Sequence, residues 1–143
     1  MVTELIALIL LGVAAFCDCR ARKIPLVWVL LLFGCALIRA AHALTHGGNA
    51  PHTLLLAALP GAALMLLSVC SGHAMGLGDG LVLLAAGPVF GFAPTLTALM
   101  IAFFCSALVS ALLLACKKAD RKTRIPFVPF LAAALGVMCV AHL

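Results

Sequence analysis

The chain has 143 residues, of which 66% are hydrophobic and only 9% are charged, and its mean hydropathy is +1.32. Soluble domains average about 45–50% apolar and about 25% charged residues, so this composition excludes a soluble globular domain. The net charge of +5 is small and concentrated in two short segments. That pattern excludes nucleic-acid binding through a basic folded face and indicates a lipid bilayer as the partner.

The apolar runs are continuous and lack the alternation of β-barrel strands, so we expect membrane helices. In chain order the predicted spans cover residues 2–17, 24–44, 53–70, 81–92, 94–116 and 125–143. The fourth is shorter than the ~20 residues that a bilayer needs, so we expect it to begin in the preceding glycine-rich segment or to be covered by its neighbours. The predicted fold is an all-α integral membrane protein, a bundle of about six transmembrane helices forming one domain over residues 1–143.

Basic residues predict the orientation of this bundle. Eight of the nine lie in two segments, which contain Arg20, Arg22, Lys23, and Lys117, Lys118, Arg121, Lys122, Arg124. The positive-inside rule places both segments in the cytoplasm, so an even number of crossings must separate them. A break between the fourth and fifth spans, at Gly91 and Pro94, makes the number of crossings between the two basic segments even. Both termini are then outside.

Two acids are therefore expected at the same membrane face. Asp18 ends the first span, and Asp79 precedes the fourth within Met75-Gly76-Leu77-Gly78-Asp79-Gly80, a stretch that we predict to be a loop because of its glycines. An acid at the edge of a membrane segment is costly and is a functional candidate. The structural alternative for Asp79 is a helix N-cap. Glu4 and Asp120 are interpreted as solvated charges.

Two carboxyl groups held close share a proton, and such a pair hydrolyses peptide bonds without a covalent intermediate or a cofactor. A serine or cysteine nucleophile needs a nearby histidine. Of the five histidines, only His73 lies near the glycine-rich segment, since the others are placed outside. The cytoplasmic face has too few ligands for a metal, and no cysteine pair has C-x-x-C spacing.

Three motifs make the chain resemble the type IV prepilin peptidases, in the short form associated with tight-adherence (Flp) pili. They are Asp18-Cys19-Arg20-Ala21-Arg22-Lys23-Ile24-Pro25, Gly76-Leu77-Gly78-Asp79, and Ile125-Pro126-Phe127-Val128-Pro129-Phe130-Leu131-Ala132. The resemblance implies a membrane-embedded aspartic endopeptidase with Asp18 and Asp79 as the catalytic residues. It assigns supporting positions to Gly76, Gly78, Arg22, Ile24, Pro25, Pro126 and Pro129.

The implied reaction removes a short basic leader from pilin or pseudopilin precursors at the cytoplasmic face of the inner membrane. Longer family members also methylate the new N-terminus with a cytoplasmic domain, and from this chain we expect peptidase activity only. The chain departs from the family pattern at three positions: Leu26 stands where Asn is usual, Leu81 where Lys is usual, and Val128 where Gly is usual.

Two alternatives stay open. Presenilin-like intramembrane proteases share the Gly-x-Gly-Asp motif, but they pair it with Tyr-Asp and Pro-Ala-Leu motifs, and this chain has no Tyr and no Pro-Ala-Leu. An inactive membrane scaffold or small transporter is the second alternative. A transporter places polar residues near the bilayer midplane, whereas here they gather at one edge. The particular pilin and the oligomeric state are not predicted.

Overall fold

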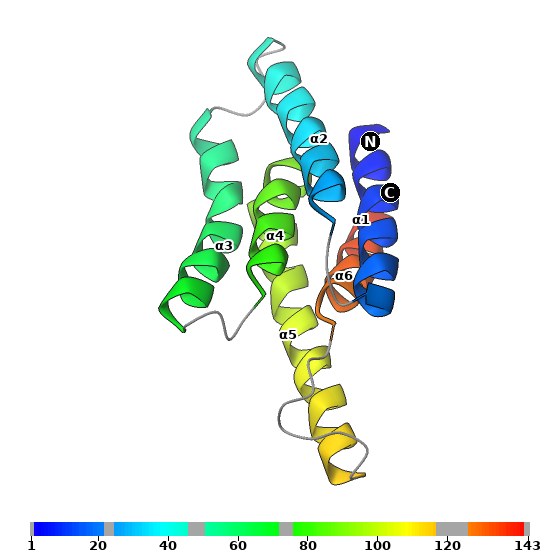
Figure 1. The fold of residues 1–143 in the computed structure, drawn as a ribbon. Coiled ribbons are helices and arrows are strands. Elements are labelled where there is room, and N and C mark those ends of the chain that lie inside the picture. Colours follow the sequence, from blue (N-terminus) through cyan, green and yellow to red (C-terminus); the bar gives the residue numbers. More distant parts are fainter. Residues whose placement is uncertain (1, 22–24, 46–50, 72–75, 117–125, 142–143) are drawn as a thin grey trace.

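The computed structural model describes residues 2–21, 25–45, 51–71, 76–116 and 126–141, and these form six helices that run up and down in alternation (Figure 1). The prediction of an all-α membrane bundle is confirmed. The helices are α1 (Val2–Ala21), α2 (Leu26–Thr45), α3 (Pro51–Cys70), α4 (Leu77–Phe90), α5 (Phe92–Ala115) and α6 (Val128–Ala141).

Four of these helices, α1, α2, α3 and α5, are long and apolar enough to cross a membrane. The other two, α4 and α6, have 14 residues each. At 1.5 Å per residue each is about 21 Å long, which is less than the ~30 Å of a hydrocarbon core. The short α4 begins within the glycine-rich segment and contacts α1, α2, α3 and α5, as the sequence predicted.

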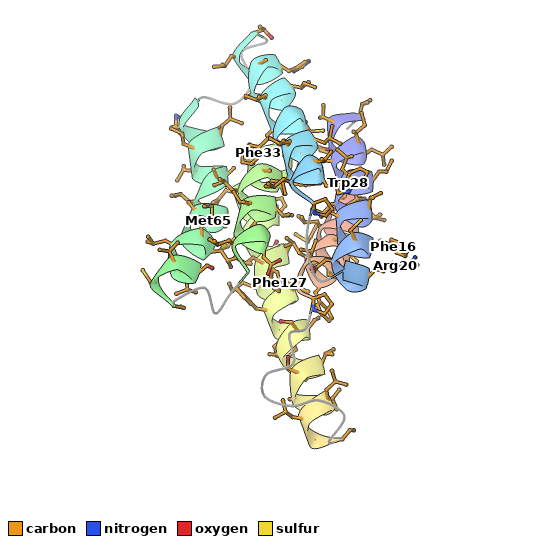
Figure 2. The ribbon with its side chains drawn as sticks, in the orientation of Figure 1. Phe16, Arg20, Trp28, Phe33, Met65 and Phe127 are labelled. Atoms are coloured by element: carbon orange, nitrogen blue, oxygen red, sulfur yellow. The ribbon has the colours of Figure 1, made fainter. Side chains whose placement is uncertain are left out.

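Close packing against α3 explains why that segment is helical. A Cβ atom on Gly80 would lie 2.7 Å from Met65 Cγ, and one on Gly61 would lie 2.8 Å from the carbonyl carbon of Leu83. Figure 2 shows Met65 on α3, on the side that faces α4. The glycines thus let two helix backbones approach closely, as small residues do in membrane bundles. Our prediction of a loop over residues 76–80 was wrong beyond Gly76, because helix packing outweighs the low helix propensity of glycine.

The predicted break between the fourth and fifth spans is confirmed at Gly91. This residue has φ +92°, a conformation that favours glycine, and its N–H donates to the Gly87 carbonyl oxygen at 2.8 Å. The chain reverses there and α5 runs back along the bundle. As a result the N- and C-termini lie at one end of the bundle, while α1 finishes and α4 and α6 begin towards the other (Figure 1).

Glu4 corrects one expectation, because it is paired and not simply solvated. Its Oε1 lies 2.9 Å from Nη1 of Arg39, and the two side chains are 25% and 33% exposed. The pair joins the first turn of α1 to the C-terminal half of α2. Asp120, the other acid that we interpreted as solvated, lies outside the described residues.

Candidate active site

The register of α1 directs Asp18 into the bundle. Ala7, Leu11 and Ala14 are fully buried, and Asp18 continues this stripe at helical spacing with only 7% of its surface exposed. Phe16 and Arg20, two residues to either side, lie on the opposite face and point away from the bundle (Figure 2). Asp18 is therefore an interior carboxyl group near the C-terminal end of α1.

Asp79 is the third residue of α4 and does not act as its N-cap. That position belongs to Gly76, which makes no side-chain capping hydrogen bond, and Asp79 N–H donates to the Gly76 carbonyl oxygen at 3.1 Å. The side chain folds back over the cap, since a Cβ atom on Gly76 would lie 2.8 Å from Asp79 Oδ2. A side chain at position 76 would therefore press on the Asp79 carboxyl group. The half-buried Gly78 lies between them in the first turn, where a helix N-terminus favours negative charge.

The two acids lie on helices that contact each other. Helix α1 contacts α4, and the end of α1, which carries Asp18, lies towards the same end of the bundle as the start of α4, which carries Asp79 (Figure 1). The charge of Asp18 acts electrostatically on Asp79. Two carboxyl groups that interact in this way do not ionise independently.

Helix α6 contributes a third part of the site. The backbone N–H of Val128, the first residue of α6, donates a hydrogen bond to the Asp18 carboxylate. The other oxygen, Oδ2, is buried and has no hydrogen-bond partner among the described residues. Sequence reasoning missed Val128 because a backbone donor leaves no residue-type signal. The available signal was the third motif, which surrounds it with Pro126 and Pro129.

The remaining motif residues are placed as follows. Pro25 immediately precedes α2, and its carbonyl oxygen accepts a hydrogen bond from Trp28 N–H at 3.1 Å, so it lies at the N-terminal boundary of that helix. Pro126 precedes α6, and Pro129 is the second residue of that helix. Arg22 and Ile24 lie outside the described residues, as does His73.

Metal-binding potential is limited in the part of the chain that the structure describes. There, no three His, Cys, Asp or Glu side chains come together in a way that fits a metal ion. The cysteines described are all free thiols.

Comparison with known families gives one match. The model described as the type IV leader peptidase family matches residues 5–111, about three quarters of the 143 residues. The matched region contains Asp18 and Asp79 and ends before α6. No curated protein and no solved structure matches the chain.

Proposed function

The chain belongs to the type IV leader peptidase family, and we propose that Asp18 and Asp79 form the catalytic pair of an aspartic endopeptidase. Its substrates are pilin or pseudopilin precursors, from which it removes the short leader peptide. The observation that carries this proposal is that the buried Asp18 lies on a helix in contact with α4 and that its charge acts on Asp79.

The chemistry follows from one shared proton. The ionised carboxylate removes a proton from a water molecule, whose oxygen attacks the carbonyl carbon of the scissile bond, while the protonated carboxyl group donates a hydrogen bond to the carbonyl oxygen. The tetrahedral species collapses with cleavage of the C–N bond. The proton taken from water passes to the leaving amine, which becomes the new N-terminus, and the acid pair returns to its starting state.

The orientation of the helix bundle suggests where the substrate is held. The end of α1, which carries Asp18, and the start of α4, which carries Asp79, lie away from the end that carries both termini (Figure 1). Arg20, which is exposed in the last turn of α1, belongs to the first basic segment. The positive-inside rule then supports an active site at the cytoplasmic face of the inner membrane, with the termini on the other side. A basic leader in the cytoplasm and an apolar helix in the bilayer would place the bond between them at this level.

Carboxamide variants test the proposal. Asn keeps the size of Asp but neither ionises nor gives up an acidic proton. We expect Asp18→Asn and Asp79→Asn each to abolish cleavage of a co-expressed precursor, and the double variant to cost little more, since residues that act as a unit are strongly non-additive. Asp120→Asn makes the same chemical change at the acid of the second basic segment, so it is the matched control and should leave cleavage intact.

Membrane levels of each variant are compared on a blot, so that a loss of protein is not read as a loss of activity. Neutralising an acid in a membrane protein relieves a desolvation cost, so levels near wild type are expected. An inactive scaffold predicts no cleavage by any form of the chain. Substantial cleavage by either single Asn variant would exclude the two-aspartate mechanism.

A further inference from the structure

Backbone donors in the first turn of α6 are fully accounted for in the structure. The N–H groups of Phe130 and Leu131 both donate to the Phe127 carbonyl oxygen, at 3.1 and 3.3 Å, and Pro129 has no N–H. The remaining donor of the turn is the Val128 N–H, and it is the one that reaches Asp18. A buried backbone donor needs a partner, and here the partner is the carboxylate of another helix.

We propose that the Val128 N–H is a positioning group for the reaction, in that it fixes the Asp18 carboxylate so that Oδ2 is left free to act on water or on the shared proton. This inference rests on the proposed catalytic role of Asp18. Val128 acts through Asp18 and is therefore a positioning residue. Helix α6 becomes part of the active site although its described residues include no acidic, basic or histidine side chain.

The start of α6 is held firmly enough for this task. The Phe127 ring packs on Phe103 of α5, with ring centroids 5.1 Å apart and planes inclined by 40°. Val128 and Leu131 are fully buried, and α6 contacts both α1 and α5. Figure 2 shows Phe127 at the end of the bundle where α6 begins. Aromatic pairs of this kind add to burial in fixing a helix end.

Pro129 completes the arrangement. A proline in the first helical turn loses no intrahelical hydrogen bond, because the first N–H groups of a helix have no partner within it. The motif therefore leaves one first-turn donor, at position 128, directed to Asp18. Any residue except proline supplies that donor, so the departure from Gly to Val at position 128 keeps the contact.

The test compares a variant that lacks the N–H at position 128 with a variant that keeps the N–H and changes only the side chain. Val128→Pro lacks the donor, and proline suits the first position of a helix, so α6 is expected to persist. Val128→Ala keeps the donor and shortens the buried side chain. Losing a hydrogen bond to a charged group lowers a rate by about ten- to hundredfold. We therefore expect the kcat of Val128→Pro to be lower than the kcat of Val128→Ala by about that factor, with little change in KM.

A second measurement covers the case in which Val128→Pro fails to accumulate in membranes. Replacing the Phe127–Val128 peptide bond by an ester, through a hydroxy acid introduced at position 128, removes the N–H and retains the side chain. A fall of about tenfold or more in kcat of the ester form supports positioning by the N–H. Activity of the Pro and ester forms equal to that of Val128→Ala overturns it. Asp18→Asn is run in parallel: cleavage by that variant defeats the proposed function itself, whatever the result at Val128.

Discussion

The contact between α3 and α4 sets the depth of Asp79, and Gly80→Ala is the perturbation that tests this. Its new Cβ atom would lie 2.7 Å from Met65 Cγ, 3.1 Å from Met65 N and 3.2 Å from Met65 Cα. The Met65 side chain is flexible and yields readily. The backbone atoms of α3 do not, so α4 must move away from α3 by a few tenths of an ångström, and Asp79 is the adjacent residue.

The magnitude follows from two opposing effects. Alanine is about 1 kcal/mol better than glycine within a helix, whereas overpacking a tight contact costs about 1–3 kcal/mol. The net expectation for Gly80→Ala is a loss of roughly 0–2 kcal/mol in stability. The cleavage rate should fall further than the loss of folded protein alone explains. A small displacement of a catalytic group can lower the rate by about a hundredfold.

Two other glycines provide matched controls. A Cβ atom on Gly12 or on Gly34 would meet nothing within 4 Å, so Gly12→Ala and Gly34→Ala should be stable and active. Gly87→Ala is the strong opposite case, since its Cβ atom would collide with the carbonyl oxygen of Ala57. Thermal unfolding in detergent and precursor cleavage are measured for all four. If Gly80→Ala cleaves as fast as Gly12→Ala, the packing of α3 on α4 does not position Asp79.

Three further predictions concern orientation, substrate and a family departure. Single-cysteine labelling in a cysteine-free background should place Arg22, Met75 and Lys118 in the cytoplasm and Gly48 outside, because basic segments stay inside; Arg22 and Met75 on opposite faces would contradict the proposed site. Mass spectrometry of a processed precursor should show a new N-terminus without a methyl group, and an added methyl group would contradict the assignment of peptidase activity alone. Leu81→Lys restores the usual family residue next to the acid pair, so cleavage should stay or rise, and a clear loss at normal protein level would show that the core has repacked around Leu81.

Hydropathy and charge predicted much of the fold, because bilayer thickness and the positive-inside rule constrain a membrane chain strongly. The break at Gly91 followed from needing an even number of crossings, and the structure has it within the predicted stretch. The register of Asp18 could also be read from the sequence, since it continues the 7-11-14 spacing of small and apolar residues along α1. These features depend on composition, charge and periodicity along the chain, and not on contacts between helices.

Features that depend on contacts between helices could not be predicted. Glycine propensity argued for a loop at Gly78 and Gly80, whereas both residues are helical and α3 packs closely on Gly80. The Glu4–Arg39 ion pair joins two helices, and no sequence motif around either residue indicates which residue it pairs with. The Val128 donor belongs to the backbone, which every residue type except proline shares.

The positions at which α4 and α6 begin have a physical reason in the proposed site. Within a membrane protein, backbone N–H groups that are free to bind a carboxylate occur at helix N-termini, because those inside a helix are already paired. Asp79 lies in the first turn of α4, and Asp18 accepts from the first turn of α6. The start of α6 therefore supplies a donor to Asp18, and the N-terminus of α4 supplies a favourable dipole to Asp79. If α6 began one turn earlier in the sequence, the Val128 N–H would be bonded within the helix. The free N–H groups would then lie beyond Asp18, and its carboxylate would have no backbone donor.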